Sequence, residues 1–296
     1  MNHVASLASS NVRKTWVLMT VFFAVVTGLG FLMTHYTGNS SFLYSAALLS
    51  IVMNVVAYWK SDTIAISSSG AIPADPAQYA QLHALVEKMA AQEGVPKPRV
   101  YIINDPAPNA FATGRNPAHA AVAATTGLLH IMNQAELEGV IAHEMSHVVN
   151  RDILVSSVAV VLVGLVASLS NLFIHASAFG GSNNENRSPL FAILGFIGII
   201  VAPLAANLVH LAISRKRESL ADLSGAELTR DPEGLASALE KLEQYSRPMQ
   251  SASAATAHLF ISNPFGALPA GLSFQRLFST HPPLEERIAV LRGLKM

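Results

Sequence analysis

The sequence predicts an α+β, polytopic membrane protein with four transmembrane helices and a mainly helical domain that contains a small β-sheet. Three observations lead to this class. Of the 296 residues, 51% are hydrophobic and only 13% are charged, whereas soluble domains contain about 25% charged residues. Several uncharged stretches have the length that a helix needs to cross a bilayer. The polar remainder alternates between helical spacing and short runs rich in β-branched and aromatic residues.

The composition also excludes several classes of protein. The 19 basic and 19 acidic side chains balance to a net charge of zero, so the chain has no basic footprint for nucleic acid. Its high hydrophobic content excludes an intrinsically disordered chain. Because cysteine is absent, disulfide scaffolds, thiolate metal sites and cysteine nucleophiles are excluded together.

The four uncharged stretches are residues 16–33, 42–59, 153–174 and 190–213. A buried core helix is the alternative for each of them, and a signal peptide is a second alternative for the first. No small-residue cleavage site follows that first stretch, so we interpret it as a retained anchor.

The flanks that are rich in basic residues all lie on one side of these stretches. Their basic residues are Arg13, Lys14, Lys60, Arg151, Arg215, Lys216 and Arg217, whereas the loop 34–41 has no Lys or Arg and the loop 175–189 has only Arg187. By the positive-inside rule, both termini and both long polar segments are cytoplasmic. The predicted organisation is a cytoplasmic N-terminus over 1–15, a membrane hairpin over 16–59, a first half-domain over 60–152, a second hairpin over 153–213 and a second half-domain over 214–296.

Within the half-domains, local patterns predict the elements in order. Asn133 is an N-cap with Glu136 as its capping-box partner, at the start of a helix that ends near residue 150. The other predicted elements are a possible strand at 63–67, strands at 99–104, 110–113 and 120–126, helices at 77–93, 215–229, 232–245 and 282–294, and a loop over 250–278.

One motif carries chemistry. His143 and His147 are four positions apart on the predicted helix, so both imidazoles project from one face and can reach one metal ion. Glu144 lies about 100° further round the helix, where it can act as a general base. The alternative is two solvent-facing histidines without a ligand.

A third ligand is expected from a carboxylate or histidine, because a catalytic zinc has three protein ligands and an open position. The segment 214–222 offers Glu218 as that ligand. Asp222, one turn further on, can accept a hydrogen bond from the non-ligating nitrogen of a metal-bound histidine. The alternative is that both acids pair with the adjacent residues Arg215, Lys216 and Arg217.

Four segments together resemble a known family. They are NAFATG (109–114), AHEMSHVVNRD (142–152), SRKRESLAD (214–222) and THPPLEERI (280–288), and they resemble the HtpX-type integral membrane zinc metalloproteases and, more distantly, the CAAX prenyl endopeptidases. The resemblance implies a zincin-like endopeptidase of the gluzincin type. It implies one zinc ion per chain, bound by His143, His147 and Glu218, with Glu144 as the catalytic base. It further implies stress-linked quality control of membrane proteins at the cytoplasmic face of the bacterial inner membrane.

Further residues take supporting roles in this interpretation. His281, by the resemblance and because Pro282 and Pro283 stiffen its turn, is the first candidate to stabilise the oxyanion, with a helix cap as the alternative. Arg287 is the second candidate, and pairing with Asp222 is its structural alternative.

The segment 109–114 is expected to be an edge strand beside the active helix. Asn109, Ala110 and Phe111 would then bind substrate that adds to the sheet as a further strand. An ordinary sheet strand is the alternative. The expected partners are protein or peptide substrates, chiefly membrane proteins, and the lipid bilayer. Nucleic acid is not expected, and homo-oligomerisation stays open.

Three other functions compete with this interpretation. A CAAX-type prenyl endopeptidase would cleave prenylated peptides, but such enzymes have more membrane segments. A non-catalytic membrane scaffold could retain a structural metal, but it has no need of Glu144. A transporter is disfavoured because the uncharged stretches provide almost no polar path.

Overall fold

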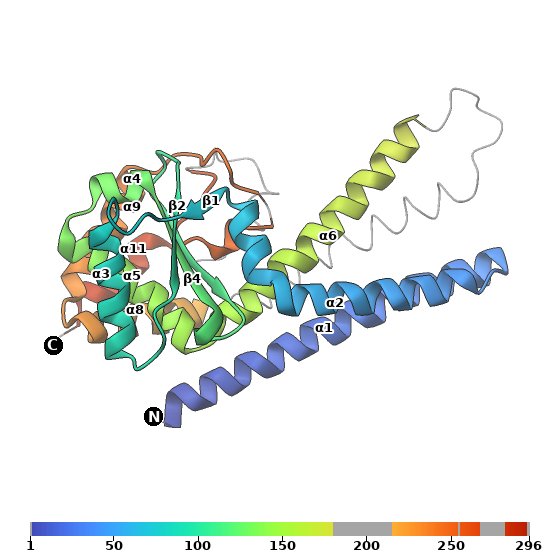
Figure 1. The fold of residues 1–296 in the computed structure, drawn as a ribbon, viewed down its shortest axis with the longest axis horizontal. Helices are drawn as coiled ribbons and strands as arrows, with labels where there is room; N and C mark the ends of the chain where they lie inside the picture. The colour runs from blue at the N-terminus through green and yellow to red at the C-terminus, as the bar shows by residue number, and fades with distance from the viewer. Residues whose placement is uncertain (1, 180–214, 254, 267–281, 295–296) are drawn as a thin grey trace.

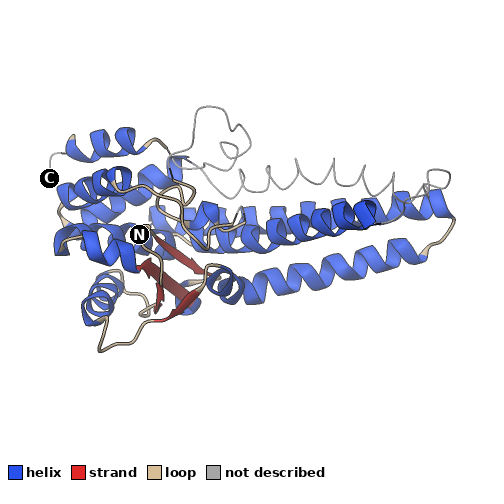
Figure 2. Ribbon diagram, turned by 90° about the horizontal axis from the view of Figure 1, so that it is seen from above, coloured by secondary structure: helices blue, strands red, loops and turns tan. Residues whose placement is uncertain are grey.

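The computed structural model describes residues 2–179, 215–253, 255–266 and 282–294, and in the first of these ranges it describes side chains from residue 6 to residue 165. Long helices extend from one side of a body that contains shorter helices and a small sheet (Figures 1 and 2). This arrangement confirms the predicted mixture of mostly helical structure with a small sheet.

Two of the described helices are long and apolar enough to cross a membrane. They are α1 (Asn2–Thr37), which qualifies over Ser6–Thr37, and α2 (Ser41–Ser68). A third span is obtained only if α5 (Gln134–Val149) and the beginning of α6 (Asp152–Phe179) count as one span bent by 83°. The predicted stretch 190–213 lies outside the described residues, so the total of four spans stays a prediction.

Aromatic side chains gather where α1 and α2 approach the body. The rings of Trp16 and Tyr58 stack at 6.2 Å between centroids, and Trp59 meets Tyr58 edge-on at 5.4 Å. The guanidinium of Arg115, from the body, lies 4.9 Å from the centroid of the Trp59 ring. Trp and Tyr of this kind are enriched at the membrane–water interface. This cluster therefore marks the end of the hydrophobic part of both helices.

The prediction of a possible strand at 63–67 was wrong, because α2 continues as a helix to Ser68. The buried residues Ala57, Ser61 and Ala65 recur every four positions, which is helical rather than strand spacing. The helix is also held near its end by Asp62, whose Oδ2 lies 2.6 Å from Nη2 of Arg99. The last turns of α2 thereby leave the membrane helix pair and cover the sheet.

The sheet has four strands in the order β1-β2-β4-β3. The strands β2 (Arg99–Ile103) and β4 (Ala120–Thr125) are parallel, and β3 (Ala110–Gly114) is antiparallel to β4 at the sheet edge. These three confirm the predicted strands. The fourth strand, β1 (Ala71–Pro73), was not predicted from the sequence, and it pairs with β2 over three residues.

Both faces of the sheet are buried. One face, which includes Val100, Ile102 and Val122, packs into the main core with α3 (Ala80–Gln92) and α5. The opposite face, which includes Phe111 and Ala123, packs against the end of α2, Val160 of α6, and Met249, Leu259 and Phe260. Because both faces are covered, the strands are rich in alanine and aliphatic residues instead of alternating with polar ones.

The helix α5 is the centre of the body. Its predicted capping box is present, since Asn133 and Glu136 exchange side-chain-to-backbone hydrogen bonds of 3.0 and 2.7 Å. The helices α8 (Arg215–Thr229) and α9 (Pro232–Gln244) pack against it, and α11 (Leu284–Arg292) packs on α9 and α8. The short helix α4 (Thr126–Ile131) directly follows β4. Glycines allow close approach of these helices: a Cβ on Gly225 would lie 3.0 Å from the backbone N of His143, and one on Gly139 would lie 2.7 Å from that of Leu235.

We expect Gly139→Ala to destabilise the protein by about 1–3 kcal/mol, because its methyl group would overpack against rigid backbone. Thermal unfolding in detergent measures the effect. Gly28→Ala is the matched control, since no described residue lies within 4 Å of the position that its methyl group would take and alanine favours a helix. Equal melting temperatures for Gly139→Ala and the parent protein would contradict this packing.

Candidate metal centre and active site

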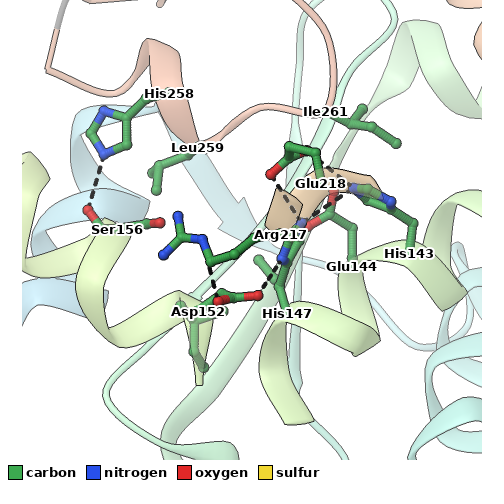
Figure 3. A pocket seen from close by; sticks show the side chains of 12 residues that line it. His143, Glu144, His147, Asp152, Ser156, Arg217, Glu218, His258, Leu259 and Ile261 are labelled. Carbon is green, nitrogen blue, oxygen red and sulfur yellow. Dashed lines mark hydrogen bonds and ion pairs between the residues drawn. The ribbon is translucent and has the colours of Figure 1, made fainter. Parts of the chain in front are cut away.

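Three side chains from two helices converge on one point. His143 and His147 come from α5 and Glu218 comes from α8 (Figure 3). The two Nε2 atoms are 3.2 Å apart, and the Glu218 oxygens lie 3.8 Å from Nε2 of His143 and 3.7 Å from Nε2 of His147. The three ligand atoms lie within 4.8 Å of one another, so they could hold one metal ion.

This donor set fits a divalent transition metal. Ligand atoms at 2.0–2.1 Å from a tetrahedral ion are about 3.3–3.4 Å apart, which is close to the three observed separations. Imidazole and carboxylate are ligands that suit zinc. Two of the ligands are buried, since His143 is 1% exposed and Glu218 is 4% exposed, and His147 is half-buried.

Glu144 lies beside these three side chains and is itself buried, at 1% exposure. Its carboxylate accepts a hydrogen bond from the backbone N–H of Ala112 in β3. Burial raises the pKa of Glu144 to about 7, and the charge of Glu218 acts in the same direction. A carboxyl group with a pKa near neutrality can both accept and return a proton at physiological pH.

The outer nitrogen of His143 faces a buried carboxylate. Nδ1 of His143 lies 3.0 Å from Oδ1 of Asp222. Asp222 in turn accepts two hydrogen bonds from Arg287, at 2.8 Å from Nε and 2.7 Å from Nη2. Arg287 also donates from Nη1 to the carbonyl of Ile261 at 3.2 Å. Burial would raise the pKa of Asp222, but its bonds to His143 and Arg287 hold it at about 2, so this carboxylate stays charged.

The outer nitrogen of His147 also faces a carboxylate, which was not predicted from the sequence. Nδ1 of His147 lies 3.0 Å from Oδ2 of Asp152, the first residue of α6. In the sequence pattern, Asp152 only marks the beginning of a membrane segment. The available signal is its charge: an acid directly before 22 uncharged residues, five positions after the motif, needs a partner.

The two histidines differ in their protonation. Burial lowers the pKa of His143 to about 4, so its Nε2 is free to bind a cation at neutral pH. Burial also acts to lower the pKa of His147, but Glu218 and Asp152 outweigh it and raise this pKa to about 9. Without a cation, His147 therefore carries a proton.

The predicted substrate-binding residues lie at the edge of the sheet. Asn109 is buried, and its side chain donates to the carbonyl of Ser262 at 3.0 Å and accepts from the N–H of Ser262 at 3.2 Å. The carbonyl of Ala110 accepts from the N–H of Ile261 at 3.0 Å. The ring of Phe111 points to the opposite face of the sheet, where it meets Phe260 edge-on at 5.1 Å. This part of the edge is therefore occupied by the chain's own segment.

His281, predicted to stabilise the oxyanion, lies outside the described residues. Arg287 is engaged with Asp222, which is its structural alternative. A cavity of about 20 Å³ lies at the metal centre, and it has room for little more than one water molecule. It is lined by residues from β3, α5, α6 and α8 and by His258, Leu259 and Ile261 (Figure 3).

Comparison with known proteins agrees with this site. The family model described as Peptidase family M48 matches residues 76–295. This chain belongs to peptidase family M48. A protein described as "Protease HtpX homolog" from Caldanaerobacter subterraneus subsp. tengcongensis is 46% identical over 97% of both chains. One with the same description from Pyrococcus furiosus is 45% identical over 96% of both chains.

A crystal structure of S. mikatae Ste24p matches with a TM-score of 0.49 at 18% identity, and covers 97% of this chain and 67% of that one. By its family and its HtpX relatives, this M48 protein is an HtpX-type membrane metallopeptidase, with His143, His147 and Glu218 as its candidate metal site.

We expect Arg287→Met to lower the free energy of unfolding of this M48 protein by about 3–5 kcal/mol, because it leaves the buried charge of Asp222 without its partner. Chemical unfolding in detergent measures the change. Arg292→Met on the same helix is the control, since Arg292 pairs with Glu233 and Glu240 at the exposed surface. It should cause little change. A control as unstable as Arg287→Met would refute a specific role of the buried pair.

Metal binding should weaken as the pH falls. A ligand histidine must be neutral, and the raised pKa of His147, about 9, means that a proton has to leave before the cation binds. We expect the apparent affinity for Zn²⁺ to rise about tenfold per pH unit between pH 6 and 8. Competition with a chelator of known affinity at each pH measures this slope. An affinity that does not vary with pH would contradict the protonation of His147.

Proposed function

We propose that this metallopeptidase is zinc-dependent and hydrolyses peptide bonds of misfolded or damaged membrane proteins at the cytoplasmic face of the bacterial inner membrane. The observation that carries the proposal is the cluster of buried His143, half-buried His147 and buried Glu218, with buried Glu144 beside it. Asp152, the first residue of α6, lies 3.0 Å from Nδ1 of His147, so the cluster is next to the beginning of this helix. A hydrolytic centre at that position suits substrates held in the same membrane.

The residues divide the work of hydrolysis. Zinc, when bound, supplies a Lewis acid that polarises a carbonyl and lowers the pKa of a water molecule. His143, His147 and Glu218 would hold the ion, one per chain, and leave a fourth position open. Glu144 would take the proton from the attacking water and deliver it to the leaving amine. Its pKa of about 7 suits both steps.

Two further groups would assist this reaction. We propose His281 as a donor to the developing oxyanion, since such a charge needs a donor besides the metal. Arg287 serves a different purpose in this scheme, because both of its strong hydrogen bonds go to Asp222. It would hold Asp222, and through it His143, in the orientation that ligation requires.

Substrate would bind along β3. In this antiparallel strand the backbone groups of Ala110, Ala112 and Gly114 point away from β4, and the N–H of Gly114 donates to Oγ of Ser157 in α6 at 3.0 Å. Ala112 lines the cavity at the metal centre, so a peptide paired with β3 would pass beside Glu144. Ile261 now pairs with Ala110 at this edge, and the cavity of about 20 Å³ is too small for a peptide. Productive binding therefore requires the segment 259–262 to leave the edge.

The cytoplasmic orientation rests on the basic residues that flank the membrane stretches on one side. Arg13 and Lys14 precede the aromatic cluster of Trp16, Tyr58 and Trp59, while the loop 34–41 at the far end of the helix pair has no basic residue. The same reasoning puts the whole body, with its metal centre, in the cytoplasm. The CAAX-type endopeptidase and the non-catalytic scaffold remain the alternatives.

One experiment tests the proposal. Full-length protein in proteoliposomes would be mixed with three substrates: a membrane protein bearing an unfolded cytosolic tail, the same protein folded, and a prenylated CAAX peptide. Loss of Glu144 as base removes proton transfer, so Glu144→Gln should bind zinc but lose cleavage by at least about 100-fold. Glu138→Gln is the control and should cleave normally. Glu138 lies on the same helix as Glu144, and its carboxylate pairs with Lys88 of α3.

The outcomes separate the alternatives. Chelator-sensitive cleavage of the unfolded tail supports quality control, and selective cleavage of the prenylated peptide supports the CAAX alternative. Metal binding without any cleavage by the parent protein supports the scaffold. Full activity of Glu144→Gln would rule out Glu144 as the base.

A further inference from the structure

Asp152 contacts the metal centre through one oxygen and the membrane helix α1 through the other. Its Oδ2 lies 3.0 Å from Nδ1 of His147. Its Oδ1 accepts a hydrogen bond of 2.6 Å from Nδ2 of Asn11, a residue of α1. The side chain of Asp152 is therefore held between a candidate metal ligand and a residue 141 positions away in the sequence.

Asn11 holds both sides of a sharp corner. The axes of α5 and α6 differ by 83°, and Arg151 between them has a φ of 57°. The Nδ2 of Asn11 donates to the carbonyl of Asn150, before the corner, at 2.9 Å, as well as to Asp152 after it. Asn11 therefore bridges the two sides of this corner, next to the carboxylate of Asp152.

The environment of Asn11 supports a specific role. Asn11 is 2% exposed, and a buried amide is costly unless its donors are satisfied. Nε of Arg217 lies 3.5 Å from the same Oδ1 of Asp152. Both groups engage one oxygen of the carboxylate and leave the other for His147. An apolar residue at position 11 would pack against the corner but could not orient this carboxylate.

We propose that Asn11 is a positioning residue for His147. Acting through Asp152, it keeps the outer nitrogen of His147 bonded and its Nε2 directed at the metal. The way α1 docks against the body thereby sets the geometry of the metal centre. This inference rests on the proposed role of His147 as a metal ligand.

A double-mutant cycle tests the proposal on the full-length protein in detergent micelles. The affinities for Zn²⁺ and Co²⁺, by chelator competition, and the visible spectrum of bound Co²⁺ would be measured for Asn11→Leu, Asp152→Ala and the double variant. We expect Asp152→Ala to weaken zinc binding by about 10–100-fold, and Asn11→Leu by about tenfold. The double variant should bind like Asp152→Ala alone, because both changes act along one path.

Thr15→Val is the matched control. Thr15 is equally buried one turn along α1, and its hydroxyl donates within the helix, to the carbonyl of Asn11. The zinc affinity and the Co²⁺ spectrum of Thr15→Val should match those of the parent, whereas Asn11→Leu should alter both. If Asn11→Leu does not fold, Asn11→Ser, which cannot reach both acceptors, decides in the same way.

Two results would overturn the proposal. One is a zinc affinity of Asn11→Leu equal to that of the parent. The other is that Asn11→Leu lowers the zinc affinity of Asp152→Ala as much as it lowers that of the parent. His147→Ala separates this failure from failure of the metal site itself. If His147→Ala binds zinc as tightly as the parent, the proposed site is wrong. If it loses zinc while Asn11→Leu does not, only the role of Asn11 is wrong.

Discussion

The buried carboxylate of Asp222 holds the metal centre together. It faces His143 of α5, sits on α8 with Glu218, and accepts two hydrogen bonds from Arg287 of α11. Arg287 also donates a hydrogen bond to the carbonyl of Ile261, beside β3. One charged group thus joins three helices and the segment along the sheet edge. The cost of burying the charge of Asp222 is offset only when both His143 and Arg287 are in place. The elements that carry these residues are therefore expected to form as a unit.

This linkage matters because the two parts of the site are far apart in the sequence. The histidines lie before the helix α6, and Glu218 lies after the segment that follows it. Close packing brings them together: Gly225 lets α8 approach the backbone of His143. Each half of the body contributes only part of this ligand set, so metal binding reports the assembly of both halves. Zinc would accordingly stabilise the folded protein over the unfolded chain.

The features that could be predicted from the sequence are those that depend on local spacing. The four-residue interval of His143 and His147, the capping box at Asn133 and the strands at Arg99, Ala110 and Ala120 are all set by neighbours in the chain. The strand β1, the extension of α2 over the sheet and the pairing of Ile261 with Ala110 could not be predicted in this way. They depend on contacts between distant segments, which leave no periodic signal. Asp152 and Asn11 belong to the same group, because the partner of each lies on another helix.

The aromatic cluster of Trp16, Tyr58 and Trp59 has a consequence for which polypeptides can be cut. Such rings lie at the interface, and Asn11, which touches the corner beside His147, is five residues from Trp16 along α1, or about 7.5 Å. In the proposed function, the catalytic groups would then be held at a small height above the membrane surface. A folded domain is about 30 Å across and does not fit into that gap, whereas a single extended strand does. The height of the site would act as a steric filter that admits only unfolded chain close to the membrane, without any recognition of side chains.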